Sequence, residues 1–456
     1  MGTFGVLLGL ATLIVLALRG VNILIVSLIA AGIVAVSNGQ SWTEALTVHY
    51  TGAMMGFAGA FFVLFLTGAI FGRVMADSGA AQSIGLALRQ LFGDERALLI
   101  IVLASAGLTY GGVNVFIVVF ALYPLGLGIV ARANLPKRLL VAATGLGAAT
   151  FTMTALPASP SIQNNISANT LGTPLTAQPV LGIIAAIIMF GLGMAYLNWQ
   201  TRVARTRGEG FVPSAADALG DDDPEPRTLP GWQQALIPLG LVVACIVAPR
   251  LLIGTVADIG EPRSNYDSLL AFTAQQPLLW TGLALVVGIL SALVLLRRFL
   301  PNVRETLSCG AESSALPLLN TAAVIGFGGV VRQTAVFNAF ANAILSSDLP
   351  PLVSATLSVN VMAGIVGSAS GGLQIWMSSF AQEYLRAGID PEVLHRVATV
   401  ASGGLDSLPH CGGVITMFTV MGVTHRQAYK DFAAVTVLIP VLAAAVIVAL
   451  VLALGY

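Results

Sequence analysis

The sequence predicts an all-α polytopic membrane protein made of two inverted repeats, with broken helices and re-entrant hairpins. Of its 456 residues, 56% are hydrophobic and 9% are charged, and the mean hydropathy is +0.88, whereas soluble domains carry about 25% charged residues. Several apolar runs approach the ~20 residues that an α-helix needs to cross a bilayer, and none has the alternation of a barrel strand. The clearest runs are 181–197, 234–248, 278–296 and 433–454.

A motif that occurs twice predicts the repeat. The segment 111–116 (GGVNVF) returns in outline as 371–376 (GGLQIW), and two downstream motifs keep the same order. An internal repeat with an amide in a Gly-interrupted apolar stretch is typical of a secondary transporter. The downstream pairs are Leu135-Pro136 with Asp390-Pro391 and Leu156-Pro157 with Leu408-Pro409.

The chain divides into two membrane halves, residues 1–198 and 232–456, joined by a hydrophilic linker, 199–231. The linker is rich in charge, Gly and Pro, which predicts a flexible connector. Basic residues near span ends place the linker in the cytoplasm and the loop 254–276 outside. These basic residues are Arg132, Lys137, Arg138, Arg202, Arg205, Arg207, Arg297, Arg298 and Arg304.

Corresponding loops of the two repeats differ in charge. The loop after the first Gly-Gly segment is basic, whereas its counterpart has the balanced charge expected outside, so the repeats are expected to be inverted. The counterpart contains Glu383, Arg386, Asp390, Glu392, His395 and Arg396.

The two Gly-Gly segments are expected to form hairpins. Residues 97–131 and 352–386 are too long for one crossing and short for two. We expect their tips, at 110–114 and 370–374, to lie at membrane depth, so that Asn114 and Gln374 reach a water-filled or protein-lined interior.

A polar break interrupts the first half near 156–165. Two prolines remove helical donors, and a helix restarting near Ser161 would present free N–H groups and the positive end of its dipole, which suits a carboxylate. An ordinary surface loop with N-capping is the alternative. The candidate substrate ligands here are Ser159, Ser161, Gln163 and Asn164.

The matching break in the second half, near 402–416, contains Asp406, Ser407 and His410. An acid at the centre of a membrane helix costs about 2.5–3.5 kcal/mol on the most lenient scale, so it is a functional residue by default. Asp406 is the first candidate for the coupling ion and His410 the second, with Ser407 and His410 as further substrate ligands. The alternative is an interfacial acid capping the next helix, with His410 a satisfied structural residue.

Other functions are disfavoured. The net charge is zero without a basic cluster, so we expect no nucleic acid partner. The four histidines form no zinc-type pair, so no metal site is expected. Asp406, Ser407 and His410 lie too close in sequence to be aligned as a hydrolytic triad, so we expect no enzyme and no cofactor. A cation/proton antiporter without an organic substrate remains the alternative.

At the two breaks the chain resembles the gluconate permease family of proton symporters, especially its hydroxybutyrate permease branch. The segments that carry the resemblance are LPASPSIQNN with LGTPLTAQPVLG, and SGGLDSLPHCGGVIT with MGVTHRQAYKD. The resemblance implies the wider ion-transporter superfamily, a scaffold that dimerises, a transport bundle with two hairpins, and the two breaks as the binding region. Where gluconate transporters tend to have His-Pro after the first break, this chain has Ala158-Ser159-Pro160, which favours an acid smaller than a sugar acid.

The sequence therefore predicts a multi-pass protein of a bacterial-type inner membrane that carries a small organic acid, such as a hydroxybutyrate or gluconate, together with H⁺ or Na⁺, most simply H⁺. A homodimer is expected from the resemblance.

Overall fold

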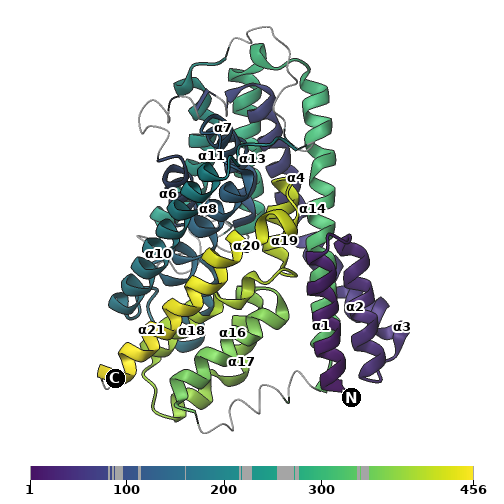
Figure 1. The fold of residues 1–456 in the computed structure, drawn as a ribbon, viewed down its shortest axis with the longest axis vertical. Coiled ribbons are helices and arrows are strands. Elements are labelled where there is room, and N and C mark those ends of the chain that lie inside the picture. Colours follow the sequence, from purple (N-terminus) through teal and green to yellow (C-terminus); the bar gives the residue numbers. More distant parts are fainter. Residues whose placement is uncertain are drawn as a thin grey trace.

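The computed structural model of the chain describes residues 2–80, 96–110, 115–159, 161–214, 229–253, 277–335 and 349–454, together with residues 83, 84, 87, 217, 272 and 339. Regular structure in these parts is helical, and none of them contains a strand (Figure 1). The prediction of an all-α fold is confirmed. Four helical stretches are long and apolar enough to cross a membrane: Trp42–Asp77, Pro179–Thr206, Val303–Val331 and His425–Leu454.

The helices follow one another as two similar series. The first half contains α1 (Gly2–Leu18), α2 (Ile23–Ser37), α3 (Trp42–Glu44), the π-helical turn η1 (Ala45–Tyr50), α4 (Thr51–Asp77), α6 (Ala97–Tyr110), α7 (Val115–Arg132), α8 (Lys137–Ala149), the π-helical turn η3 (Phe151–Ala155), α9 (Ile162–Leu171) and α10 (Pro179–Thr206). The second half contains α11 (Trp232–Ile253), α13 (Pro277–Leu295), η4 (Arg297–Phe299), α14 (Val303–Val331), α16 (Pro351–Val366), α17 (Ala369–Arg386), α18 (Pro391–Ser402), η5 (Leu405–Ser407), α19 (Gly412–Val420), α20 (His425–Ala433), η6 (Ala434–Leu438) and α21 (Ile439–Leu454).

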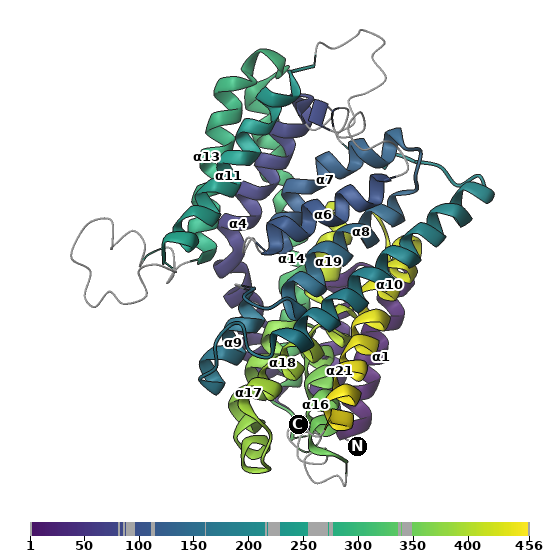
Figure 2. The ribbon, with the colours of Figure 1, turned by 90° about the vertical axis from the view of Figure 1, so that its left-hand side faces the viewer.

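The repeat is visible in the order of elements. A long helix (α4 or α14) precedes a helix pair (α6–α7 or α16–α17), then two short helices separated by a break (α8–α9 or α18–α19), then a long helical stretch. The packing is reciprocal, since α9 contacts α17 of the other series and α19 contacts α7. Figure 2 shows α6, α7 and α8 toward one end of the molecule and α16, α17 and α18 toward the other.

The short helices α8 and α18 lie in the interior. Every residue of α18 from Val393 to Ser402 is buried, and in α8 every residue except Arg138 is buried. Both helices nevertheless carry charged residues, whose buried side chains need partners inside the protein. The chain is still buried directly after each helix, at Thr150 and Gly403, whereas Ala158 and Ile162 of the first break are exposed.

The short helical turns that follow α8 and α18 end for a common reason. Leu156 and Leu408 each precede a proline and are extended, with ψ angles of 131° and 159°. A proline ring disfavours the helical conformation in the residue before it. Pro157 and Pro409 therefore end η3 and η5 at corresponding positions.

The second hairpin turns earlier than predicted. Its break is at Gly367, which is left-handed with φ +67°, and at Ser368, which caps α17 by accepting from Gly371 N–H. Residues 370–374 are helical, so the predicted tip there is wrong. Gly372 instead lets two helices cross closely, because a Cβ at this position would lie 2.5 Å from the Cα of Ala363.

The first hairpin breaks where the sequence indicated. α6 ends at Tyr110 and α7 begins at Val115. Residues 111–114, and Asn114 with them, lie outside the described residues.

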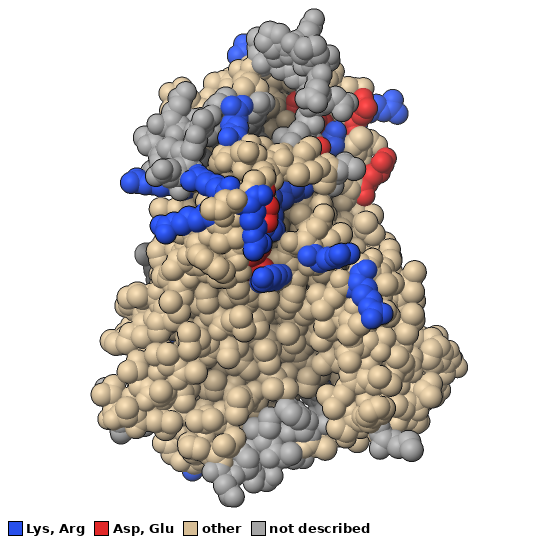
Figure 3. Space-filling view, in the orientation of Figure 1, with Lys and Arg blue, Asp and Glu red and all other residues tan. Residues whose placement is uncertain are grey.

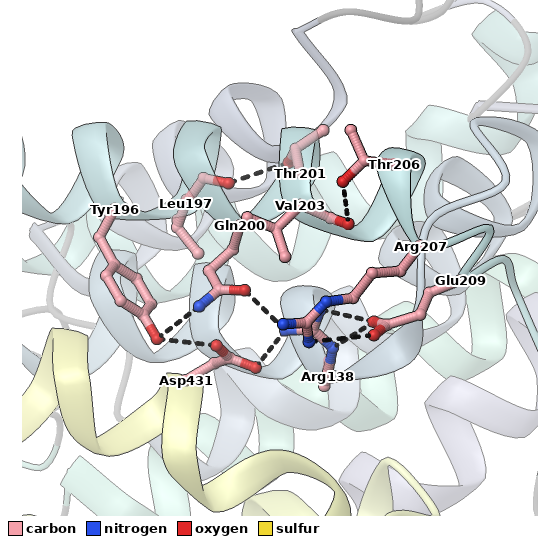
Figure 4. A network of polar contacts seen from close by, with 10 residues as sticks. All are labelled: Arg138, Tyr196, Leu197, Gln200, Thr201, Val203, Thr206, Arg207, Glu209 and Asp431. Carbon is pink, nitrogen blue, oxygen red and sulfur yellow. Dashed lines mark hydrogen bonds and ion pairs between the residues drawn. The ribbon is translucent and has the colours of Figure 1, made fainter.

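The start of the expected linker is ordered. α10 continues to Thr206, past residue 199, and the chain beyond it is bound to the bundle by ion pairs. Arg138 of α8 contacts Glu209 at 2.6 Å and Asp431 of α20 at 2.5 Å (Figure 4), and Lys137 contacts Asp217. This part of the predicted flexible connector is therefore fixed to the first half, which Arg138 in turn joins to the second half through Asp431.

Charged side chains are unevenly distributed. On the face that Figure 3 shows, Lys and Arg gather in the upper part, whereas the lower part is largely without charge. Both termini lie toward the lower end in the same orientation (Figure 1). A one-sided basic distribution is what the positive-inside rule expects at a cytoplasmic end, and the orientation itself stays a prediction.

Candidate functional site

The two breaks lie side by side. A Cβ on Gly403 of the second break would lie 2.8 Å from Cγ2 of Thr154 in the first, so glycine is what permits this approach. α18 also packs against η3. The structure thus brings together the two segments that the sequence singled out.

The two serines of the first break serve its own backbone. Ser159 is 1% exposed, and its hydroxyl donates to Thr152 O at 2.7 Å. Ser161 caps α9, because its hydroxyl accepts from Asn164 N–H at 3.2 Å. Such caps satisfy backbone donors that a helix start leaves unpaired. Both residues shape the break, and their role as substrate ligands stays a prediction.

Asn164 is the centre of a buried network between the halves. Its Nδ2 donates to Ser159 O at 2.8 Å and to Leu175 O at 2.9 Å. Its Oδ1 is therefore the acceptor, facing His395 Nε2 at 2.7 Å and Arg396 Nη1 at 3.5 Å. An amide with all these partners has little capacity left for a ligand. The geometry favours a role in positioning the break.

His395 and Arg396 were expected in an external loop, and the structure corrects this. Both belong to α18 and are 0% exposed. Apolar neighbours on either side, such as Leu394 and Val397, were the signal in the sequence that these two residues are buried. Because His395 Nε2 faces the acceptor Asn164 Oδ1, Nε2 is the donor in that contact. Its Nδ1 lies 2.6 Å from the Thr173 hydroxyl, which donates to Nδ1 when the imidazole is neutral.

Arg396 is enclosed by backbone carbonyls of the first half. Its Nε donates to Ala177 O at 2.9 Å and its Nη2 to the same oxygen at 2.7 Å. Further contacts at 3.3 Å join Nη1 to Ala155 O and Nη2 to Leu175 O. This side chain therefore fastens α18 to the segments on either side of α9.

Gln163 differs from its neighbour Asn164. It is 5% exposed, yet its amide makes no hydrogen bond to any described residue. Buried amides in proteins nearly always have partners. Among the predicted residues of the first break, Gln163 is the one whose polar atoms are available to a ligand.

The second break holds Asp406 and His410. Asp406 is half-buried and accepts from the Ser407 hydroxyl at 3.1 Å. His410 is 0% exposed, and its Nε2 donates to Gly364 O at 2.8 Å, while its buried Nδ1 has no partner among the described residues. The roles of Asp406 and His410 in binding and coupling stay predictions.

The helix that restarts after the second break has an open N-terminus. Cys411 precedes α19 and provides no side-chain cap. A Cβ on Gly413, in the first turn, would meet nothing within 4 Å. The unpaired N–H groups of such a turn attract anions. The unpartnered Nδ1 of His410 lies immediately before this turn in the chain.

Gln374 is not part of this arrangement. It lies on an exposed side of α17, and no hydrogen bond joins it to either break within the described parts of the chain. Its counterpart Asn114 lies outside those parts.

Comparison with known proteins gives a consistent result. Residues 1–454 match the family model described as GntP family permease. The chain is 36% identical to an uncharacterized transporter, YxjC, of Bacillus subtilis, over 95% of each chain. It is 23% identical to the D-serine transporter DsdX of Escherichia coli O6:H1, over 86% of this chain and 85% of that protein. It is 25% identical to the high-affinity gluconate transporter of Escherichia coli K12, over 74% and 73%.

A solved structure, the YdaH transporter of Alcanivorax borkumensis, is similar with a TM-score of 0.35 and 15% identity, over 90% of this chain and 89% of that one. We base nothing on so weak a similarity.

Proposed function

Because the chain belongs to the GntP permease family and is thus a multi-pass membrane transporter of small organic compounds, we propose that it is a proton-driven symporter of a small hydroxycarboxylate, such as a hydroxybutyrate. The gluconate and D-serine transporters to which it is similar support this class, since gluconate and D-serine each carry a carboxylate and hydroxyl groups.

The observation that carries the proposal is the open start of α19. Its uncapped first turn offers backbone N–H groups, and His410 Nδ1 beside it is buried without a partner. A buried polar atom without a partner costs free energy unless a ligand or water fills the site. A substrate carboxylate on the N–H groups, with a substrate hydroxyl that donates to Nδ1, would satisfy both. Gln163 of the adjacent break is available for a substrate hydroxyl.

On this proposal Asp406 binds the coupled proton. Carrying a bare carboxylate through the membrane interior is costly, so we expect Asp406 to be protonated in the loaded state. Its nearest recorded donor is the Ser407 hydroxyl, which can serve the ionised form.

The repeated order of elements supports alternating access. Reciprocal packing of α9 on α17 and of α19 on α7 is what an inverted repeat produces. On this proposal the hairpins approach the site from opposite sides of a bacterial inner membrane. We also expect a homodimer, which the family resemblance implies.

A panel of ligands tests the function. Purified protein is screened for thermal stabilisation by 3-hydroxybutyrate, D-gluconate, acetoacetate and D-serine, and the best ligand is then tested for uptake into proteoliposomes under an inward proton gradient. We expect stabilisation and gradient-dependent uptake of at least one acid. Proton or sodium exchange with no uptake of any acid would instead identify a cation/proton antiporter.

A further inference from the structure

Arg396 differs from the other buried charges of the described residues. Lys137 contacts the carboxylate of Asp217, and Asp431 contacts Arg138. Arg396 is 0% exposed, and all its recorded partners are neutral: three carbonyl oxygens and the Asn164 amide oxygen. A buried charge is costly unless it is neutralised.

The carboxylate nearest to Arg396 in the sequence has another partner. Glu392 lies one helical turn earlier on α18, a spacing at which ion pairs form readily. Its Oε2 instead accepts from Gln178 N–H at 3.2 Å, and it makes no ion pair with Arg396. The described part of the chain thus contains no carboxylate paired with this guanidinium.

We infer that Arg396 is the fixed counter-charge of the transported carboxylate, an inference that rests on the function proposed above. A guanidinium does not lose its proton in proteins. Its N–H groups are occupied by the carbonyls that border the first break, so it acts on the substrate through its charge and not through a hydrogen bond. The carbonyl cage holds that charge at the break where α9 begins.

The charge also explains why proton and substrate would move together. When Asp406 is ionised and no substrate is bound, the charges of Asp406 and Arg396 sum to zero. When Asp406 is protonated and a monovalent carboxylate is bound, the sum is again zero. Either change alone leaves one net charge in the interior, and a net charge is costly to move through a membrane. The empty and the fully loaded forms are therefore the ones that reorient.

Apart from Glu392, the groups around the two charges are neutral. Around Arg396 they are His395 of α18, Asn164 of α9 and Thr173 of the following connector, and Glu392 in the first turn of α18 accepts from Gln178 N–H. Around Asp406 they are Ser407, His410, Cys411 and, from α20, Tyr429 and His425, which donate to Ser407 O and Pro409 O.

A matched pair of ligands distinguishes an effect of the Arg396 charge on binding from a structural effect of its substitution. The carboxylate of the panel that wild type binds most tightly is compared with its own primary amide, which has nearly the same shape without the charge. In Arg396→Gln we expect carboxylate affinity to fall by at least about tenfold, with amide affinity changing less than about threefold. Arg396→Lys, which keeps the charge and loses the bidentate carbonyl contacts, should retain most of the wild-type ratio of carboxylate to amide affinity.

The control is Glu392→Gln, which removes a carboxylate from the same helix and should leave the ratio unchanged. Equal losses for both ligands in Arg396→Gln and Arg396→Lys would mean that Arg396 is only structural. The ratio of carboxylate to amide affinity could also rise in Glu392→Gln by as much as it falls in Arg396→Gln. Glu392 would then be the counter-ion of Arg396. Either result overturns the inference, whereas a wild-type protein that binds no acid of the panel contradicts the proposed function itself.

A second variant covers the case in which Arg396→Gln does not fold. Asp406→Asn with Arg396 intact leaves a permanent unit of positive charge. Carboxylate affinity at pH 8 should then rise relative to wild type while amide affinity stays the same. No change in the ratio would show that the two charges are not linked, and would also overturn the inference.

Discussion

Replacing Asn164 by alanine should destabilise the protein more than it weakens ligand binding. The Nδ2 of Asn164 donates to Ser159 O and Leu175 O, and its Oδ1 accepts from the Nε2–H of His395, all at 2.7–2.9 Å. Removal of this side chain leaves Ser159 O and the Nε2–H of His395 without that partner, whereas Leu175 O still accepts from Arg396 Nη2. Each of the two groups costs about 1–3 kcal/mol, so the loss is on the order of 2–6 kcal/mol before water enters the space.

The matched control is the neighbouring amide. Asn165 is half-buried, and its Nδ2 donates to Ser161 O at 2.8 Å within the same helix. Loss of this one hydrogen bond should cost about 1 kcal/mol, so Asn165→Ala should destabilise the protein less than Asn164→Ala. Both variants and wild type are compared by thermal unfolding in detergent, with and without the best carboxylate of the panel.

A positioning role and a direct substrate-binding role of Asn164 predict opposite results for stability and affinity. We expect the unfolding temperature of Asn164→Ala to fall clearly below that of Asn165→Ala, with ligand affinity in the remaining folded protein changed by less than about threefold. An Asn164→Ala protein that melts like wild type and has lost ligand affinity would refute this reasoning and make Asn164 a direct substrate ligand.

Three further outcomes are expected. Gln163→Ala should lower substrate affinity by about ten- to hundredfold with little change in melting, because its amide has no partner within the described structure; unchanged affinity would remove it from the site. Gly372→Val should abolish folded protein in size-exclusion chromatography, since a Cβ there lies 2.5 Å from the Cα of Ala363; a normal elution profile would count against the close helix crossing. Asp217→Asn should expose the chain after α10 to limited proteolysis, because the ion pair with Lys137 is lost; a cleavage pattern identical to that of wild type would show that this contact does not hold the segment.

Much of the fold could be read from the sequence because its signals are local. Apolar runs gave the helices, and the two Leu-Pro pairs gave the breaks, since a proline acts on the residue directly before it. An inverted repeat would also account for the contact between Thr154 and Gly403, because its equivalent segments meet near a common axis.

The errors concern contacts between segments distant in the sequence. Gly371-Gly372 was interpreted as a hairpin tip, although Gly372 is needed for the approach of α16 to α17. His395 and Arg396 were assigned to a loop because charge usually means exposure, and only the fold shows the carbonyls that surround Arg396. Likewise, nothing in the sequence distinguishes the amide of Asn164 from that of Gln163, which has no hydrogen bond to a described residue.

The central claim is that proton and carboxylate move together through the site at the breaks, and one comparison tests it most directly. Wild type and Asp406→Asn are reconstituted in proteoliposomes, and uptake of the best-binding labelled carboxylate is measured with an imposed pH gradient and, separately, as counterflow without a gradient. We predict that wild type accumulates the acid under the gradient, whereas Asp406→Asn shows counterflow but no accumulation. Full gradient-driven accumulation by Asp406→Asn would contradict the account, because the coupling ion would then bind elsewhere.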